Sequence, residues 1–233
     1  MEKKYKHLFF DLDHTLWDFD KNAEETLIEL YDVYKLKSLG IHSVDEFISV
    51  YTEYNHQLWR DYHNGVITKE ELRASRFKVT FEHFGLKEDS IPYQFEIDYV
   101  NICPTKTNLF EGAHEVLSSL KKQYHLHIIT NGFLESQTMK MERTNIRQYF
   151  DEIFVSEVIG LYKPDIALFN HALEVVKANA KEVLMIGDSL EADVLGAKNA
   201  GIDQVYFNPF SNSHDYELTH EISHLNELLT ILL

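Results

Sequence analysis

Apolar residues along this chain follow two different rhythms. An apolar run at residues 7–10 ends in Asp11, which is the pattern of a buried strand with acids at its carboxyl end. Over residues 17–104 the rhythm changes, and apolar residues recur three or four positions apart, as Leu27 and Leu30 do. This spacing places apolar side chains on one face of a helix, so we expect the second stretch to be helical throughout.

Two start signals support the helical interpretation of residues 17–104. Ser43 is followed by Glu46 and Thr68 by Glu71, which in both cases is the capping-box pattern of a helix start. We therefore expect about four helices here, with the exit near the Cys-Pro-Thr sequence that ends at residue 105.

After this exit, predicted strands and helices alternate. The apolar runs that indicate strands lie at residues 125–130, 153–156, 183–187 and 204–207, and helical patterns lie around residues 111–122, 134–147, 166–178 and 190–200. Such alternation is typical of a parallel sheet that is covered by helices on both faces. We predict an α/β fold in which residues 1–16 and 105–233 form a Rossmann-like, doubly wound parallel sheet core. Residues 17–104 are then an inserted, all-helical cap domain.

Polar residues gather where the predicted strands end. Asp11, Thr130 and Asp188 each end or follow an apolar run, and ligands of such sheets bind at the carboxyl ends of the strands. Four short motifs occur in order along the chain: Asp11-Leu12-Asp13-His14-Thr15, Thr130-Asn131-Gly132, Lys163-Pro164-Asp165, and Gly187-Asp188-Ser189 followed by Asp193. Each is weak alone, but their order and their places at strand ends make them a strong combined signal.

The charge balance restricts the partners. The chain has 22 Lys and Arg against 38 Asp and Glu, a formal net charge of −16, which disfavours a nucleic-acid polymer as partner. No apolar run approaches the ~20 residues of a membrane span, and the only cysteine, Cys103, cannot form an internal disulfide. We therefore expect a cytoplasmic protein without a membrane partner. A small anionic substrate is possible if its charge is neutralised locally, as a metal ion would do. The choice between monomer and dimer stays open.

The first motif suits attack on a phosphate monoester. Such a dianion resists an anionic nucleophile unless a cation screens the approach. Asp11 attacking phosphorus would form an aspartyl-phosphate, which divides one difficult step into two. Asp13 would protonate the leaving alkoxide and later accept a proton from the hydrolytic water. Lys163 supplies a cation that would keep Asp11 ionised and oriented.

The remaining motif residues suit Mg²⁺ and phosphate. Mg²⁺ prefers hard oxygen ligands, which the carboxylates of Asp11 and Asp188 and the backbone carbonyl of Asp13 would supply. Asp193 is expected behind these ligands, or as an occasional ligand. The Thr130 hydroxyl and the Asn131 backbone N–H would bind the non-transferring phosphate oxygens. Thr15 is expected to support the first loop.

The four motifs resemble the haloacid dehalogenase superfamily of phosphotransferases, with a helical cap inserted after the first motif. Further segments are similar to the 5′-nucleotidases that hydrolyse pyrimidine nucleoside monophosphates: Leu58 to Thr68, Thr130 to Phe133, Glu142 to Thr144 and Tyr149 to Asp151. The resemblance covers essentially the whole chain. It implies a Mg²⁺-dependent hydrolase that takes a small phosphate monoester, most simply a pyrimidine nucleoside monophosphate.

Other functions remain as alternatives. A phosphatase of the same superfamily acting on a sugar phosphate or on phosphoglycolate is the first. A phosphomutase fits less well, because mutases of this family resemble a DxDG pattern and His14 replaces that glycine. A dehalogenase does not need the acid/base that Asp13 provides, and family dehalogenases lack it. A non-catalytic binding module would normally have lost the nucleophile or Lys163, and both are present.

Three residues outside the motifs are candidates for substrate contact. Trp17 follows the first motif, whereas Trp59 and Arg76 lie in the predicted cap. Aromatic residues at helical spacing pack inside domains more often than they bind a ligand, so packing is the competing interpretation for both tryptophans. A solvated surface cation is the competing interpretation for Arg76.

Overall fold

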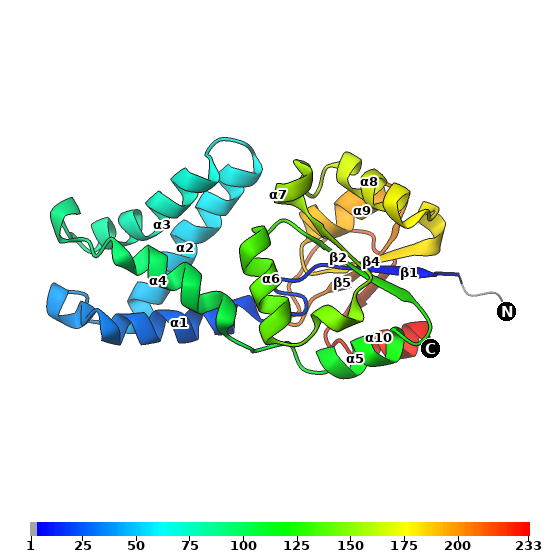
Figure 1. Ribbon diagram of the computed structural model, residues 1–233, viewed down its shortest axis with the longest axis horizontal. Coiled ribbons are helices and arrows are strands. Elements are labelled where there is room, and N and C mark those ends of the chain that lie inside the picture. Colours follow the sequence, from blue (N-terminus) through cyan, green and yellow to red (C-terminus); the bar gives the residue numbers. More distant parts are fainter. Residues whose placement is uncertain (1–3) are drawn as a thin grey trace. The chain divides into compact units, whose positions relative to one another are not determined.

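The computed structural model describes residues 4–233 and divides the chain into two compact units, shown in Figure 1. The core unit comprises the chain up to Phe19 together with Thr107–Leu233, and the helical unit comprises Asp20–Lys106. The predicted cap, residues 17–104, differs from the helical unit by a few residues at each end. Residues 1–3, which the sequence assigns to the core, lie outside the described residues.

A parallel sheet of six strands forms the centre of the described core unit, in the order β3-β2-β1-β4-β5-β6. The strands are β1 (His7–Phe10), β2 (His125–Thr130), β3 (Glu152–Val155), β4 (Val183–Gly187), β5 (Asp203–Phe207) and β6 (His220–Ile222). Every residue of β4 is buried, as expected of a strand covered on both faces. The predicted strands are present, each within a residue of its expected bounds, whereas β6 was not predicted.

Helices cover both faces of this sheet. They are α5 (Ala113–Leu120), α6 (Leu134–Arg143), α7 (Ser156–Ile159), α8 (Ile166–Val176), α9 (Gly196–Asn199) and α10 (Glu227–Leu232), with 3₁₀ turns at Arg147–Tyr149 and Ala180–Glu182 and a π-helical turn at Leu190–Leu195. In Figure 1, α8 and α9 lie on one face and α5 and α10 on the other. On the first face, Phe9 and Met185 of the sheet pack in one cluster with Phe169 of α8. The doubly wound α/β fold is confirmed.

The strand order reverses at one point of the sheet. The chain runs from β1 to β2 and β3 on one side, then crosses to β4 on the other side of β1. In open α/β sheets, ligands bind in the crevice at the carboxyl ends of the two strands that flank such a switch point. Here these strands are β1 and β4, which Asp11 and Asp188 follow directly.

The helical unit contains α-helices and short 3₁₀ turns and no strand. Its helices are α1, which begins in the core unit (Phe19–Val33), α2 (Val44–His63), α3 (Lys69–His83) and α4 (Gln94–Ile102), with 3₁₀ turns at Leu36–Leu39, Glu88–Ser90 and Cys103–Thr105. Ser43 caps α2 by accepting from the Glu46 amide, and Thr68 forms a complete capping box with Glu71 at the start of α3.

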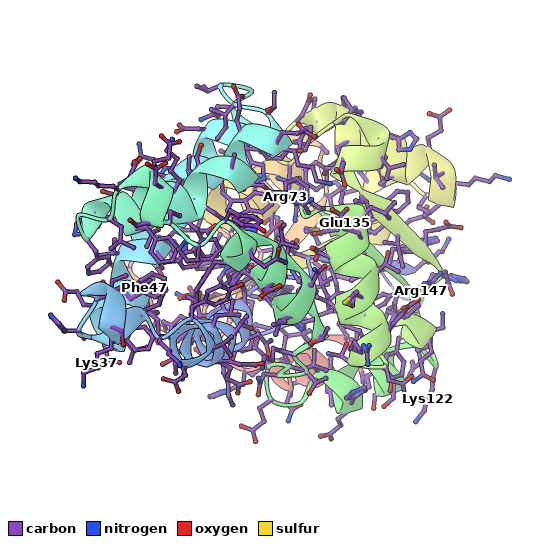
Figure 2. The ribbon with its side chains drawn as sticks, turned by 60° about the vertical axis from the view of Figure 1, so that its left-hand side comes forward. Lys37, Phe47, Arg73, Lys122, Glu135 and Arg147 are labelled. Atoms are coloured by element: carbon purple, nitrogen blue, oxygen red, sulfur yellow. The ribbon has the colours of Figure 1, made fainter. Side chains whose placement is uncertain are left out.

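An aromatic cluster fills the interior of the helical unit. The ring of Phe47, labelled in Figure 2, lies 5.6 Å from that of Phe81 and 5.9 Å from that of Phe95, centroid to centroid. All three side chains are fully buried. The helical spacing read from the sequence therefore does place these apolar residues on inward-facing stripes. Among the described residues, no helix has the length and apolar character of a membrane span.

Candidate active site

The first motif forms a hydrogen-bonded turn directly after β1. The amides of Leu16 and Trp17 both donate to the carbonyl of Leu12, at 3.0 and 2.8 Å. All three of these residues are fully buried, so apolar packing anchors the turn. Asp11 is thereby fixed at the end of β1, and Asp13 lies within the turn two residues later.

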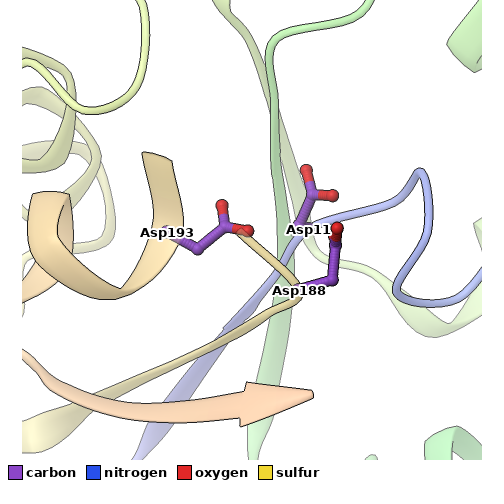
Figure 3. Close-up of side chains that lie close together, drawn as sticks. All are labelled: Asp11, Asp188 and Asp193. Carbon is purple, nitrogen blue, oxygen red and sulfur yellow. The ribbon is translucent and has the colours of Figure 1, made fainter. Parts of the chain in front are cut away.

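Three carboxylates converge at the switch point, as Figure 3 shows. Asp11 follows β1, Asp188 follows β4, and Asp193 belongs to the π-helical turn Leu190–Leu195. One oxygen from each lies within 4.8 Å of the others. Two of the residues that the sequence assigned to one edge of the sheet, Asp11 and Asp188, lie close together in the structure.

The π-helical turn brings Asp193 close to the other two carboxylates. π-Helical turns are rare and occur frequently at functional sites. The Ser189 amide donates to Asp193 Oδ2 at 3.0 Å, and Asp193 is 1% exposed. A Cβ at Gly187 would overlap the carboxylate of Asp193. The glycine of the fourth motif is therefore required by the close approach of this side chain.

Lys163 joins two of the three carboxylates. Its Nζ donates to Asp11 Oδ1 and to Asp193 Oδ1, at 2.6 Å in both cases. Lys163 is 4% exposed, and a lysine is rarely this buried unless it is paired. Thr15 supports the third carboxylate, because its hydroxyl donates to Asp188 Oδ1 at 2.9 Å.

The side chain of Asn131 holds the backbone of Lys163. Its Oδ1 accepts from the Lys163 amide at 2.9 Å and from the Ser156 hydroxyl at 2.7 Å, and its Nδ2 donates to the Lys163 carbonyl at 2.9 Å. From the sequence we expected only the Asn131 backbone N–H to act, by binding phosphate. The contact between its side chain and Lys163, and the part played by Ser156, were missed.

Asp13 is held by two residues that the motifs do not contain. Lys140 Nζ donates to Asp13 Oδ1 at 2.7 Å, and Gln137 Nε2 donates to Asp13 Oδ2 at 3.0 Å. Both residues come from α6, where they are buried together with Met141. No signal in the sequence indicated them, because polar residues on a helix are normally interpreted as solvated.

The electrostatics of the cluster leave negative charge uncompensated. Burial raises the pKa of Asp11 well above its usual range, and Asp193 and Asp188 add to the rise against the opposing charge of Lys163. Burial, together with Asp193, raises the pKa of Asp188 to about 7. Burial alone would lower the pKa of Lys163, but Asp11 and Asp193 raise it above its usual value. Three oxygen-donor side chains against one ammonium fit a divalent cation that prefers hard oxygen ligands.

The three further candidates for substrate contact lie in different surroundings. Trp17 is fully buried, and the Lys140 ammonium lies 4.4 Å from its ring centroid. Arg76 is 5% exposed and donates through Nε and Nη2 to Glu96, so it belongs to the interior of the helical unit. Trp59, half-buried on α2, contacts the rings of its helix neighbours. Trp17 and Arg76 are thus occupied by packing and pairing, and we do not retain them as substrate contacts.

Comparison with known proteins agrees with this geometry. The family model of haloacid dehalogenase-like hydrolases matches residues 5–201. The chain therefore belongs to the haloacid dehalogenase-like hydrolase family, and it is a hydrolase with the family's α/β core and helical insertion. The family expected from the four motifs is confirmed.

Individual relatives match over nearly the full length of the chain. The pyrimidine 5′-nucleotidase PynA of Streptococcus pneumoniae is 35% identical, over 98% of this chain and 95% of its own. The pyrimidine 5′-nucleotidase YjjG of Escherichia coli is 32% identical, over 98% of each chain. Among solved structures, the HAD-hydrolase YfnB of Bacillus subtilis, bound to magnesium, is 32% identical and superposes with a TM-score of 0.88 over 99% of each chain.

Proposed function

We propose that this protein is a Mg²⁺-dependent phosphomonoesterase that uses Asp11 as nucleophile and hydrolyses nucleoside 5′-monophosphates, pyrimidine nucleotides in particular. The observation that carries the proposal is the position of Asp11 beside Lys163 at the switch point, with Asp13 in the adjoining turn. Two relatives named pyrimidine 5′-nucleotidases, at 35% and 32% identity, support the substrate class.

Asp11 attacks phosphorus as the bond to the leaving oxygen breaks, and Asp13 donates a proton to that oxygen so that the nucleoside leaves as an alcohol. In the second step Asp13 accepts a proton from the water that hydrolyses the aspartyl-phosphate. Lys163 orients the Asp11 carboxylate through the contact at 2.6 Å. Thr130 Oγ1 accepts from Gly132 N–H and from Gln137 Nε2, so its own hydrogen is available to a phosphate oxygen.

The metal would be held by the carboxylates of Asp11 and Asp188 and by the Asp13 carbonyl. We assign Asp193 an outer position, because both of its oxygens already accept hydrogen bonds, one from Lys163 and one from the Ser189 amide. When bound, Mg²⁺ supplies the positive charge that lets an anionic nucleophile approach a phosphate dianion. A cytoplasmic location and the absence of a nucleic-acid polymer as partner stay predictions of the charge and composition.

Phosphate release from a panel of substrates tests the proposal. The panel contains pyrimidine and purine nucleoside 5′-monophosphates, sugar phosphates and phosphoglycolate, each with Mg²⁺ and after treatment with a chelator. We expect the highest kcat/KM for a pyrimidine nucleotide, loss of activity with the chelator and recovery on adding Mg²⁺. Release from sugar phosphates or phosphoglycolate alone would move the assignment to the alternative phosphatase.

Asp11→Asn serves as the control for the nucleophile. An amide cannot form the aspartyl-phosphate, so turnover should fall by at least about 10³-fold while the fold is retained. Activity that survives this change would show that Asp11 is not the nucleophile.

A further inference from the structure

Both oxygens of the Asp13 carboxylate are engaged by α6. Lys140 and Gln137 are three residues apart, so their side chains extend from the same face of the helix. They donate to different oxygens, Lys140 to Oδ1 at 2.7 Å and Gln137 to Oδ2 at 3.0 Å. A carboxylate held at both oxygens by two buried donors has its rotation restricted.

The ammonium of Lys140 is itself held in place by its surroundings. It lies 4.4 Å from the ring centroid of Trp17 and 5.5 Å from that of Phe19, and Lys140 is only 5% exposed. Aromatic faces attract a cation, but they do not replace the hydration that a buried ammonium has lost. Asp13 is the anion that compensates it, so the two side chains fix each other.

Gln137 links this pair to the second motif. Its Nε2 also donates to Thr130 Oγ1, at 2.6 Å, and the residue is fully buried. A Cβ at Gly132 would overlap the Gln137 amide, which explains the glycine after Thr130 and Asn131. The amide of Gln137 therefore fixes the positions of the Thr130 hydroxyl and the Asp13 carboxylate relative to each other.

We propose that Lys140 is a positioning residue for the acid/base step, and that it acts through Asp13 by holding its carboxylate in the orientation that serves the leaving oxygen. Gln137 assists it from the second oxygen. The inference rests on the proposed phosphomonoesterase function and adds to it a residue outside the four motifs.

Leaving-group dependence separates this role from a general structural one. A nucleoside alkoxide is a poor leaving group and needs the proton from Asp13, whereas p-nitrophenolate leaves without one. The ratio kcat/KM reports only the steps up to the first irreversible one, which includes departure of the leaving group. Lys140→Met should therefore lower kcat/KM for a nucleoside monophosphate by about tenfold or more, and for p-nitrophenyl phosphate by less than about threefold.

Lys121→Met provides a control for the loss of another Lys–Asp ion pair of the core unit. Lys121 also pairs with an aspartate of the core unit, Asp151, but that residue directly precedes β3 and so lies at the opposite edge of the sheet from the site. This variant should leave the ratio of the two kcat/KM values unchanged. Lys140→Arg keeps a charged donor and should recover part of the lost ratio.

The outcomes distinguish the inference from the proposed function. Wild-type activity on nucleotides decides the proposed function, and if only another alkyl phosphate is hydrolysed, that substrate replaces the nucleotide in the ratio. Equal losses with both substrates in Lys140→Met would overturn the positioning role, as would no loss with either. Crystal structures give a second readout: Asp13 should keep its rotamer in Lys121→Met and change or lose it in Lys140→Met. An unchanged rotamer in the latter would contradict the inference.

Discussion

A buried histidine pair in the sheet makes the stability of the core unit depend on pH. His127 lies on β2 and is 2% exposed. Its Nε2 is 3.1 Å from Nδ1 of His7 on β1, and its own Nδ1 has no hydrogen-bond partner among the described residues. Protonation would therefore place a positive charge and a donor without an acceptor inside the sheet.

Burial, followed by the neighbouring charge of His7, lowers the pKa of His127 from 6.5 to about 4. His125 and Lys121 act in the same direction, and Asp151 opposes them. Below pH 6.5 the folded chain thus binds fewer protons at His127 than the unfolded chain. The stability that the neutral imidazole contributes is therefore fully present above this pH and is lost as the pH falls towards 4. At pH 5 the imidazole of His127 is almost fully protonated in the unfolded chain but only about one tenth protonated in the folded chain. This difference lowers the free energy of unfolding by about 2 kcal/mol relative to pH 7.5.

Urea unfolding of the core unit measures this cost. The chain has two tryptophans, Trp17 in the core unit and Trp59 in the helical unit, so Trp59→Phe leaves Trp17 fluorescence as a reporter of the core alone. Unfolding is compared at pH 7.5 and pH 5 with chelator present, in this background and with His127→Gln added. Gln places an amide near the Nε2 position and does not titrate.

The difference between the two proteins isolates the imidazole, because the carboxylates of the candidate active site titrate in both. We expect the background protein to lose about 2 kcal/mol more than His127→Gln between the two pH values. Parallel losses in the two proteins would refute the reasoning, since His127 would then have the same pKa folded and unfolded.

Three further changes test the geometry elsewhere. Gly187→Ala should displace the Asp193 carboxylate and lower kcat more than about tenfold in a folded protein; unchanged kinetics would contradict the close approach. Asn131→Ala removes three hydrogen bonds around Lys163 and should lower the free energy of unfolding by about 2–4 kcal/mol and turnover with it, measured by urea titration and phosphate release. A loss below about 0.5 kcal/mol would mean that solvent replaces these bonds. Thr68→Ala should destabilise the helical unit by about 1 kcal/mol, followed through the tryptophan of that unit, and no change would show that the capping box adds nothing.

The sequence predicts most of the fold because the central strands are buried on both faces. A strand such as β4, with every residue buried, must be apolar throughout, and acids that follow it stand out. The start of a helix in the helical unit is equally local. The side chain of Thr68 accepts from the Glu71 amide and the side chain of Glu71 accepts from the Thr68 amide, and this pair of residues indicates a helix start in the sequence. These features depend on short stretches of chain, which one sequence is enough to reveal.

The unpredicted features depend on contacts between distant stretches. Strand β6 has three residues, of which only Ile222 is buried, and it is recognisable only by its pairing with β5. The role of the Asn131 side chain requires knowing that Lys163 lies beside it, 32 positions further on. Lys140 is separated from Asp13 by 127 positions, and a lysine on a helix is normally read as a solvated residue.

The two buried lysines of the candidate active site pair with three of its four aspartates. Lys163 pairs with both Asp11 and Asp193, and Lys140 pairs with Asp13. Within the described residues Asp188 has no ion pair, and its contact is the hydroxyl of Thr15. Burial, followed by the neighbouring charge of Asp193, raises the pKa of Asp188 to about 7. Because the lysines pair with the other carboxylates, Asp188 is the carboxylate that would rely most on the proposed divalent ion for a compensating charge.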